Sequence, residues 1–464
     1  MENDAPLDRL AALIRIPTVS LASRPSRPDQ EDGGADPASP APGAEDFDAL
    51  LATMAEQWPR LHELDVTRVG HHGLLIHWPG HSASHPVVMM AHLDVVPVVP
   101  EEWTHPPFAG EVIDGELWGR GTLDDKGCVA GLCEAVETLL RDGHVPTYDV
   151  WLSFGCDEET TGEAARAAVA ELRRRGVRPW MVVDEGGAIA SEAFPGLGAP
   201  IGVVGVTEKG TTAVRLTVTD PGGHASTPAK GGPAARLAKA LLAVDGATMP
   251  GHVSPVTVDL FRRLAPSLPI GLRQVAAQVG RMGPVAAVVL SKAGPEAAAM
   301  VRTTVAITTL RGSKAINVLP STVQAGLNLR VMVGDTVAGV VERLRKAIND
   351  DAVVIEVVDA NEPSPVSPWQ DDPAFGHLEN TIRAVYPDAI AAPYVMLAAT
   401  DSRFFTPICD RVYRFAPFRM TRAQRASIHG ADERIGVDDY LAGVGWYRRF
   451  LQTLPEQRGL GATR

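Results

Sequence analysis

The sequence predicts an α/β protein with a mixed, mostly parallel sheet covered by helices on both faces, interrupted by an inserted α+β domain. In the N-terminal part, near-continuous apolar segments alternate with helical patterns, as buried parallel strands and their covering helices do. Further along, strands alternate polar and apolar residues, which is typical of half-exposed antiparallel strands. A chain of 464 residues is also too long for one ordinary domain. We therefore expect an α/β domain in two parts, 1–205 and 363–464, and an inserted domain over 206–362.

The N-terminal part is predicted to alternate strands and helices. Residues 7–16 carry apolar side chains at helical spacing, and Pro17 ends that helix. Residues 22–45 are rich in Pro, Gly, Ala and acidic residues without periodicity, so we expect a flexible surface insertion there. The elements predicted after it are strand 85–96, helix 128–140, strand 148–156, helix 163–176 and strand 180–187.

The inserted domain is predicted from its two alternating strands and the helices between them. Its elements are strand 211–220, helix 232–244, strand 321–333, helix 341–348 and strand 352–358. We assign no element to residues 246–300, which Pro and Gly interrupt repeatedly. A helical pattern over 438–454 closes the second part of the α/β domain.

Composition excludes several classes of partner. The net charge of −13 argues against nucleic acid or an anionic membrane as the main partner. Four cysteines without a C-x-x-C pair predict buried, reduced thiols and neither a disulfide framework nor a thiolate metal cage. The acidic N-terminus does not resemble a signal peptide, and we find no apolar run of about 18 residues. We therefore expect a soluble, cytoplasmic protein.

His92 and Asp94 form an H-x-D pattern at the end of predicted strand 85–96. Residues two apart share a face of a strand, so His92 could bind a metal ion while Asp94 orients its ring. On its own, however, this pattern more often marks a buried, hydrogen-bonded histidine.

Carboxylates follow three more segments of the predicted α/β domain. Asp124 and Asp125 stand between glycines just before a helix, residues 157–159 are all acidic, and Asp184 lies in the last part of strand 180–187. Each alone is commonly an ordinary helix cap or helix N-terminus. Because strands of an α/β sheet carry their functional residues at their carboxyl ends, the four together predict a site for a divalent cation.

Six motifs then point to a known family. In chain order they are MMAHLDVVPV, LWGRGTLDDKG, SFGCDEETTG, VVDEGG, DPGGHAST and SIHGADERI. Together they resemble the co-catalytic dizinc peptidases, the family of aminoacylase, carnosinase and bacterial carboxypeptidase G (peptidase family M twenty). Within that family, VRTTVAIT, INVLPSTVQAGLNLRV and ATDSRFF look closest to the carboxypeptidase S and N-fatty-acyl-amino-acid hydrolase branch. The resemblance implies the zinc peptidase fold, with the inserted domain as a lid and dimerisation domain.

The resemblance also implies two zinc ions per chain, and cobalt or manganese would suit the same ligand types. His92 and Asp184 would bind one ion, Glu159 and His429 the other, and Asp124 would bridge them. The peptide bond that follows the bridging aspartate is cis in the family. Two zinc ions would balance the three carboxylates and a hydroxide, and so leave a neutral cluster.

Further residues match the family's catalytic and substrate-binding positions. Glu158 matches the general base, while Asp94 keeps the role of orienting His92 that its place in the H-x-D pattern suggests. His224 matches the residue that stabilises the oxyanion, often from the partner subunit, although a turn histidine that caps the next helix is an equal reading. Asn317 and Arg330 match residues that hold the substrate's carboxylate, although an isolated strand arginine is usually solvated.

These features predict a zinc-dependent hydrolase that cleaves an amide next to a free carboxylate, in N-acyl amino acids or dipeptides. Its partners would be a small-molecule substrate and a second copy in a homodimer formed through the inserted domain, with no nucleic acid and no membrane. Two alternatives remain: a deacylase of a polar intermediate of the acetylornithine or succinyl-diaminopimelate type, and a catalytically silent metal-binding protein on this fold. No phosphate loop, G-x-G-x-x-G or G-x-S-x-G motif supports a nucleotide cofactor or a serine nucleophile.

Overall fold

The computed structural model describes residues 5–20, 43–194, 196–292, 294–313 and 315–456. Most of the expected insertion at 22–45 lies outside these residues, and its last two already belong to helix α2 (Ala44–Gln57). The chain divides into two compact units. Unit 1 comprises Met1–Val206, Ser367–Ala392 and Thr400–Arg464, and unit 2 comprises Thr207–Val366 and Pro393–Ala399.

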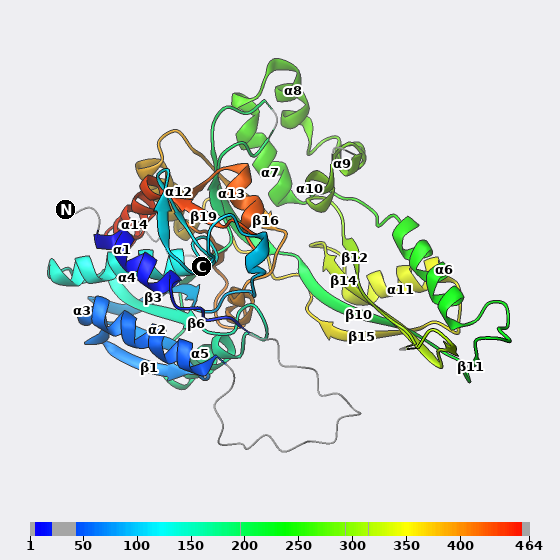
Figure 1. Ribbon diagram of the computed structural model, residues 1–464. Helices are drawn as coiled ribbons and strands as arrows, with labels where there is room; N and C mark the ends of the chain where they lie inside the picture. The colour runs from blue at the N-terminus through cyan, green and yellow to red at the C-terminus, as the bar shows by residue number, and fades with distance from the viewer. Residues whose placement is uncertain (1–4, 21–42, 195, 293, 314, 457–464) are drawn as a thin grey trace. The chain divides into compact units, whose positions relative to one another are not determined.

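A ten-stranded mixed sheet forms the core of unit 1 (Figure 1). Four neighbouring strands at its centre, β6, β3, β7 and β17, run parallel, and antiparallel strands flank them on both sides. The predicted mixed, mainly parallel α/β class is confirmed. The strands are β1 (Asp65–Val69), β2 (Gly73–Trp78), β3 (Ser82–His92), β6 (Tyr148–Gly155), β7 (Met181–Asp184), β8 (Ala188–Ala190), β9 (Ile201–Glu208), β16 (Ile390–Met396), β17 (Val412–Arg414) and β18 (Arg419–Met420).

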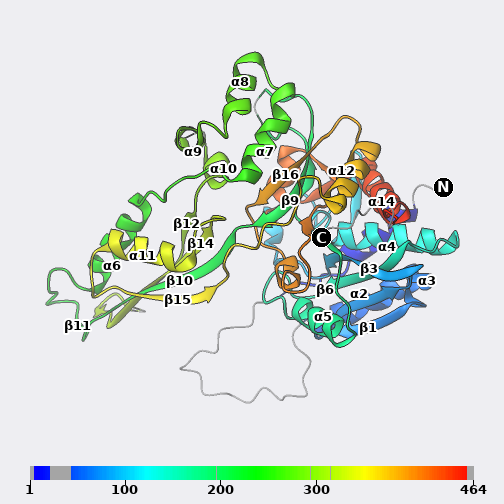
Figure 2. The ribbon, with the colours of Figure 1, turned by 180° about the vertical axis from the view of Figure 1, so that it is seen from behind.

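Helices cover both faces of this sheet because its central strands are apolar on both sides. On β3, Val88 and Met90 pack in one core cluster with residues of α5 (Glu163–Arg174). Val87 and Met89, buried on the opposite side of the pleat, face the other layer, where α4 (Lys126–Arg141) lies against β3 (Figure 2). The other helices of unit 1 are α1 (Ala5–Ile14), α3 (Pro59–His62), α12 (Pro373–Val385), α13 (Arg422–Ser427) and α14 (Val437–Gln452).

A small sheet and two 3₁₀ turns complete the framework of unit 1. A three-stranded antiparallel sheet joins β4 (Glu111–Ile113) and β5 (Glu116–Trp118) to β19 (Arg434–Gly436), far along the chain. Two 3₁₀ turns lie at η1 (Pro100–Glu102) and η3 (Asp401–Phe405). The pairing of β5 with β19 ties the segment before α4 to the segment that follows His429.

Unit 2 is built on a separate antiparallel sheet in the order β12, β14, β10, β15. Its central strand β10 (Gly210–Thr219) alternates buried and half-exposed residues, as the sequence predicted. Helices α6 (Pro233–Gly246) and α11 (Val337–Ile348) cover the apolar face (Figure 1). The remaining strands are β12 (Thr304–Arg311), β14 (Thr322–Val331), β15 (Val354–Ala360) and a small pair, β11 (Gly223–His224) with β13 (Val318–Leu319).

The stretch 246–300, to which we assigned no element, folds into four helices and a 3₁₀ turn. Two of the helices begin at a proline, Pro255 and Pro295, where the missing N–H and fixed φ suit the first helical turn. Ser254 caps the first of them by accepting a hydrogen bond from the backbone N–H of Thr257 at 3.1 Å. The prolines therefore start helices here and do not mark loops. The elements are α7 (Pro255–Leu264), η2 (Ala265–Ser267), α8 (Ile270–Gln278), α9 (Gly283–Lys292) and α10 (Pro295–Ala299).

The four cysteines, all within the described part of the chain, are buried and unpaired, as expected. Among the described residues, no helix has the length and apolar character needed to cross a membrane.

Candidate active site

Polar side chains of unit 1 gather where its central parallel strands end. β3 ends at His92 and β7 at Asp184. β6 ends at Gly155, which is the register partner of His92, and the loop after it carries Glu158 and Glu159. Because neighbouring parallel strands end at the same edge of a sheet, these segments come side by side.

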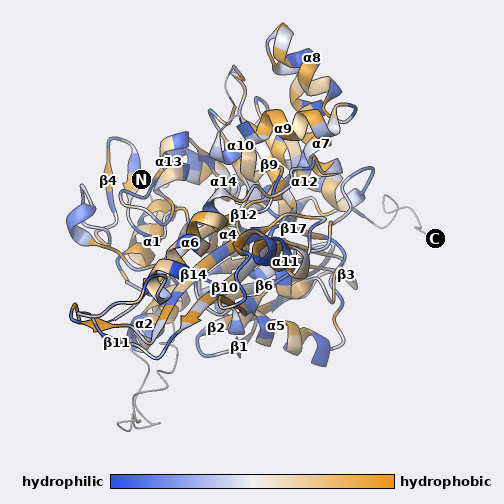
Figure 3. Cartoon of the chain, turned by 90° about the vertical axis from the view of Figure 1, so that its right-hand side faces the viewer, coloured by the Kyte–Doolittle hydropathy of each residue, from blue (hydrophilic) through white to orange (hydrophobic). Residues whose placement is uncertain are grey.

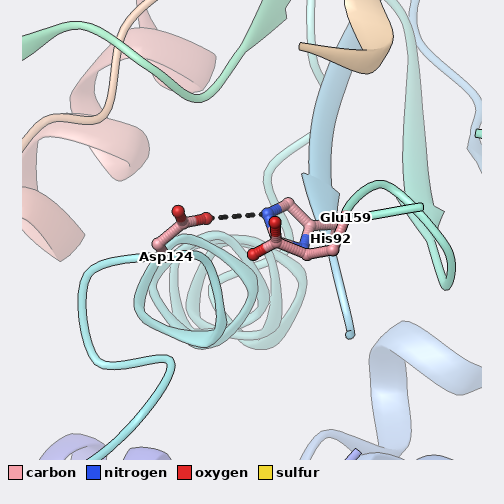
Figure 4. A group of neighbouring side chains, drawn as sticks. All are labelled: His92, Asp124 and Glu159. Carbon is pink, nitrogen blue, oxygen red and sulfur yellow. Dashed lines mark hydrogen bonds and ion pairs between the residues drawn. The ribbon is translucent and has the colours of Figure 1, made fainter. Parts of the chain in front are cut away.

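Asp124, just before α4, contacts two histidines of this group, and Figure 4 shows its contact with His92. Its Oδ1 is 2.9 Å from Nε2 of His92, and its Oδ2 is 3.0 Å from Nε2 of His429. The same nitrogen of His429 is 3.2 Å from Oε1 of Glu159. Ligand atoms of His92, Asp124 and Glu159 all lie within 4.8 Å of one another. The structure thus brings together four of the predicted metal ligands, and the peptide bond after Asp124 is cis.

Asp94 orients both a histidine and the acidic loop. Nδ1 of His92 lies 3.0 Å from the backbone oxygen of Asp94 and 3.3 Å from its Oδ1. The two carboxylate oxygens of Asp94 accept hydrogen bonds from the backbone N–H groups of Glu158 (3.2 Å) and Glu159 (3.1 Å). One buried carboxylate therefore turns Nε2 of His92 toward Asp124 and holds the turn that presents both glutamates.

Asp184 occupies a neighbouring position with different partners. Its Oδ1 accepts the backbone N–H of Glu185 at 3.0 Å, and its Oδ2 accepts that of Ser402 at 2.8 Å. Burial raises the pKa of Asp184. Within the described residues, the close group of ligand atoms around Asp124 does not include Asp184.

The charges of the cluster are held in balance by the two histidines. Burial would raise the pKa of Asp124, but hydrogen bonds with His429 and His92 outweigh it and lower that pKa. Hydrogen bonds to Asp124 and Glu159 raise the pKa of His429 to about 10. A protonated imidazole therefore supplies the positive charge that the crowded carboxylates require.

The donor set fits a divalent metal ion. Imidazole nitrogens and carboxylate oxygens are the ligands that zinc takes in catalytic sites. Oε1 of Glu159 is buried and faces Nε2 of His429 at 3.2 Å, so a cation bound by these two atoms would replace the proton between them. A bound cation would supply the positive charge that protonated His429 supplies without it.

Glu158 is the other acidic residue of the turn after β6. Burial, opposed by the nearby His92, raises its pKa well above the ordinary value, and the negative charges of Asp401 and Asp124 add to that rise. A carboxyl group whose pKa is raised in this way holds a proton more readily than an ordinary glutamate, as a base that must accept a proton and later return it requires.

Glu433 and Arg120 belong to this site, although no role was predicted for either residue from the sequence. Oε1 of Glu433 accepts the backbone N–H groups of Leu123 (2.8 Å) and Asp124 (3.1 Å), and its Oε2 accepts that of Gly121 (3.1 Å). Arg120 pairs with the same carboxylate and donates to the backbone oxygen of Gly430 at 2.6 Å. Both residues lie inside quoted motifs, but nothing in the sequence shows that they meet.

Gly430 follows His429 directly, so this buried ion pair fixes the segment that carries Asp124 against the segment that carries His429. Both residues of the pair are almost fully buried, at 2% exposure for Arg120 and 0% for Glu433. The pair therefore sets the spacing of Asp124 and His429, two predicted metal ligands, without being a ligand itself.

The predicted residues of the inserted domain lie in unit 2, in two separate places: Arg330 on β14 of the four-stranded sheet, and His224 with Asn317 at the small β11–β13 pair. His224 on β11 is exposed, and the backbone N–H of Ala225 donates to the backbone oxygen of Asn317 at 3.2 Å. Arg330 pairs in register with Thr211 and donates to its Oγ1 at 2.7 Å. From Thr211 the β10 ladder runs roughly 26 Å, at ~3.3 Å per residue, before the chain turns toward β11. One protomer therefore joins His224 with Asn317 but keeps Arg330 apart from both.

Comparison with known proteins identifies the family. The model of peptidase family M20/M25/M40 matches residues 88–453. The chain is 32% identical over 457 residues to the N-fatty-acyl-amino acid synthase/hydrolase PM20D1.1 of Danio rerio, covering 96% of this chain and 85% of that protein. It is 36% identical over 373 residues to PM20D1 of Homo sapiens (79% and 74% covered). It is 33% identical over 402 residues to the probable carboxypeptidase S-like 2 of Dictyostelium discoideum (85% and 77% covered).

Solved structures show the same fold. The metallo-carboxypeptidase Sso-CP2 of Sulfolobus solfataricus superposes with a TM-score of 0.69 at 18% identity, covering 96% of this chain and 98% of that one. Human carnosine dipeptidase 1 also gives 0.69, at 17% identity, covering 97% and 96%. The resemblance drawn from the six motifs is confirmed. The chain belongs to peptidase family M20/M25/M40 and is a metallohydrolase of the carboxypeptidase and N-acyl amino acid hydrolase type.

Proposed function

We propose that this enzyme hydrolyses the amide bond of N-acyl amino acids, with the free carboxylate of the amino acid next to the bond that breaks. The observation that carries the proposal is the convergence of His92, Glu159 and His429 on Asp124 at the carboxyl edge of the sheet. The names of the relatives favour the substrate class, because those at 32–36% identity act on N-fatty-acyl amino acids or are carboxypeptidase S-like.

Two zinc ions are the proposed cofactors. His92 and Asp184 would hold one ion, Glu159 and His429 the other, and Asp124 would bridge them. Asp124 supports the bridging role, since its two oxygens already face different histidines. When bound, the zinc ions polarise the scissile carbonyl and lower the pKa of water, so that hydrolysis proceeds at neutral pH.

Glu158 is the proposed proton carrier. The oxygen of a water molecule adds to the carbonyl carbon while its proton passes to the Glu158 carboxylate. The same proton then moves to the amide nitrogen as the C–N bond breaks, which releases the amine and leaves the acid. The raised pKa of Glu158 supports both steps, and Asp94 keeps the turn in place through the backbone of Glu158 and Glu159.

In unit 2, we propose that Arg330 and Asn317 bind the substrate's carboxylate and that His224 stabilises the oxyanion. Because Arg330 lies far from His224 and Asn317 along one ladder, a single protomer does not bring all three to one substrate molecule. We therefore propose a homodimer in which these residues come from different copies. Mixing the inactive His224→Ala and Glu158→Ala proteins tests this, since partial recovery of activity requires a shared site, and no recovery contradicts it.

The experiment that tests the function is a panel of substrates that crosses acyl-chain length with amino-acid identity. We expect hydrolysis of N-acyl amino acids, abolished by chelation and restored by added Zn²⁺. His429→Ala, which removes a proposed zinc ligand, should lower this activity. His72→Ala is its matched control and should not, because His72 lies outside the site and stacks on Phe47. Hydrolysis that survives chelation, or activity on dipeptides alone, would contradict the proposal.

A further inference from the structure

Helix α8 of unit 2 exposes apolar side chains that the proposed chemistry does not use. The helix contacts α7; Ala276 within it and Val279 directly after it are buried. Its other apolar side chains are exposed to solvent, by 76%, 49% and 49% for Ile270, Leu272 and Val275. Scattered exposed apolar residues are ordinary, but a group on one helix usually marks a contact surface.

Helix α9 continues this pattern and appears largely in the hydrophobic colour in Figure 3. Ala286 and Ala287 are buried, whereas Val285, Val288 and Val289 are 55–56% exposed. Val285 and Val289 lie one turn apart, with Met282 three residues before them and Lys292 three residues after. One stripe of the helix thus carries apolar side chains and ends in a cation. We call the exposed residues of the two helices the α8–α9 surface.

The charge of this surface differs from that of the whole chain. Residues 264–294 contain Arg273, Arg281 and Lys292 but no aspartate or glutamate, in a protein with a net charge of −13. Arg273 donates a hydrogen bond to the backbone oxygen of Pro266 (2.8 Å), and Arg281 donates one to Oε1 of Gln278 (3.4 Å); both acceptors are uncharged. The surface therefore combines exposed apolar side chains with positive charge that no carboxylate of the same segment offsets.

We propose that the α8–α9 surface docks the enzyme on an anionic lipid bilayer. Helices with an apolar face and Lys or Arg beside it lie in the headgroup region, where the apolar side chains leave water and the cations meet anionic headgroups. The net charge led us to expect no membrane partner, and this segment is a local exception to that charge. A second copy fits less well, because a two-fold contact through residues 264–294 would bring the same three cations from each protomer and no carboxylate of that segment to pair with them.

Vesicle flotation with the full chain tests this docking. We expect binding to phosphatidylcholine vesicles that contain phosphatidylserine, little binding to phosphatidylcholine alone, and weaker binding at high salt. The double variants Val285→Asp/Val289→Asp and Arg273→Glu/Lys292→Glu should each lower binding by about tenfold or more. Leu242→Asp is the matched control, because Leu242 is 73% exposed on α6, outside the surface, and should leave binding unchanged. All these side chains are exposed, so we expect every variant to keep the wild-type melting temperature and rate of amide hydrolysis. These two measurements show that the variants are folded.

A fluorescent reporter separates the lipid from a second copy. All native cysteines are buried, so a Val288→Cys variant can be labelled at that site with an environment-sensitive dye. We expect a blue shift on adding anionic vesicles and none on raising the protein concentration. A shift with protein concentration, or a dimer that Val285→Asp/Val289→Asp converts to monomer without any vesicle binding, would show a contact between copies and overturn the proposal. Vesicle binding that none of the surface variants alters would also overturn it.

Discussion

Glu433 offers the sharpest test of how the site is held in place. Its carboxylate accepts backbone N–H groups from Gly121, Leu123 and Asp124 and pairs with Arg120. In Glu433→Gln one oxygen can still accept the N–H groups of Leu123 and Asp124. The new amide nitrogen, a donor, would instead face the N–H of Gly121 and the Arg120 guanidinium, leaving that buried cation without its counter-ion.

The size of the effect follows from the burial of the pair. Removing one partner of a buried ion pair costs about 3–5 kcal/mol, because the remaining charge stays desolvated and unpaired. We expect a loss of this order in the free energy of unfolding of the metal-free protein. Because the same pair sets the spacing of Asp124 and His429, zinc affinity should also fall, by about 10–100-fold as for other residues that orient metal ligands.

The assay combines denaturant unfolding of the metal-free protein with zinc competition against a chromogenic chelator. Glu134→Gln is the matched control, because Glu134 is also buried and pairs with an arginine, Arg9, but holds no site loop. It should lower the free energy of unfolding and leave zinc affinity unchanged. The reasoning fails if Glu433→Gln also leaves zinc affinity unchanged, since Glu433 would then be a residue of the fold alone.

Three further variants test separate parts of the structure. Glu158→Gln should lower kcat by at least about 100-fold while zinc content stays at the wild-type level, because Glu158 moves a proton and is not a proposed ligand; retained kcat would refute the role. Asp94→Ala should reduce both zinc affinity and kcat by roughly 10-fold or more, because it frees the His92 ring and the turn that carries Glu158 and Glu159. Isothermal titration with zinc measures the affinity and initial rates measure kcat. Wild-type values of both would refute the role of Asp94. Burial lowers the pKa of Lys209 to about 8 from an ordinary 10.5. Between these two pH values, Lys209 is protonated in the unfolded state but neutral in the folded state. The free energy of unfolding therefore rises as the pH increases from 8 to 10.5. The difference in unfolding free energy between wild type and Lys209→Met should rise by up to about 3 kcal/mol over that pH range. A difference that does not change with pH would contradict the lowered pKa of Lys209.

The sequence was most informative where chemistry and periodicity coincide. His92 and Asp184 directly follow apolar segments, residues 87–91 and 181–183, so their place at one edge of a parallel sheet could be predicted without coordinates. The acidic turn with Glu158 and Glu159 follows the neighbouring strand in the same way. The detail that both glutamates are presented together depends on hydrogen bonds from their backbone to Asp94, which no local pattern reveals.

Long-range pairs and the helices at 246–300 were beyond sequence reasoning. Arg120 and Glu433 are separated by more than 300 residues, and an isolated Arg or Glu is normally expected on the surface. In unit 2, the prolines at 255 and 295 looked like interruptions but occupy the first turns of helices, where proline is well tolerated. The distance between His224 and Arg330 became visible only with the register of β10 and β14.

The central claim is that zinc held by residues around Asp124 is required for amide hydrolysis. Titration of the metal-free enzyme with Zn²⁺, following bound zinc and hydrolysis of an N-acyl amino acid in the same sample, tests it most directly. We predict that activity rises with zinc to a stoichiometry of about two per chain, the number that a bridged pair of ions requires, and that His429→Ala binds less zinc while His72→Ala matches wild type. Full activity in the metal-free protein, or zinc binding that His92→Ala and His429→Ala leave intact, would contradict the claim.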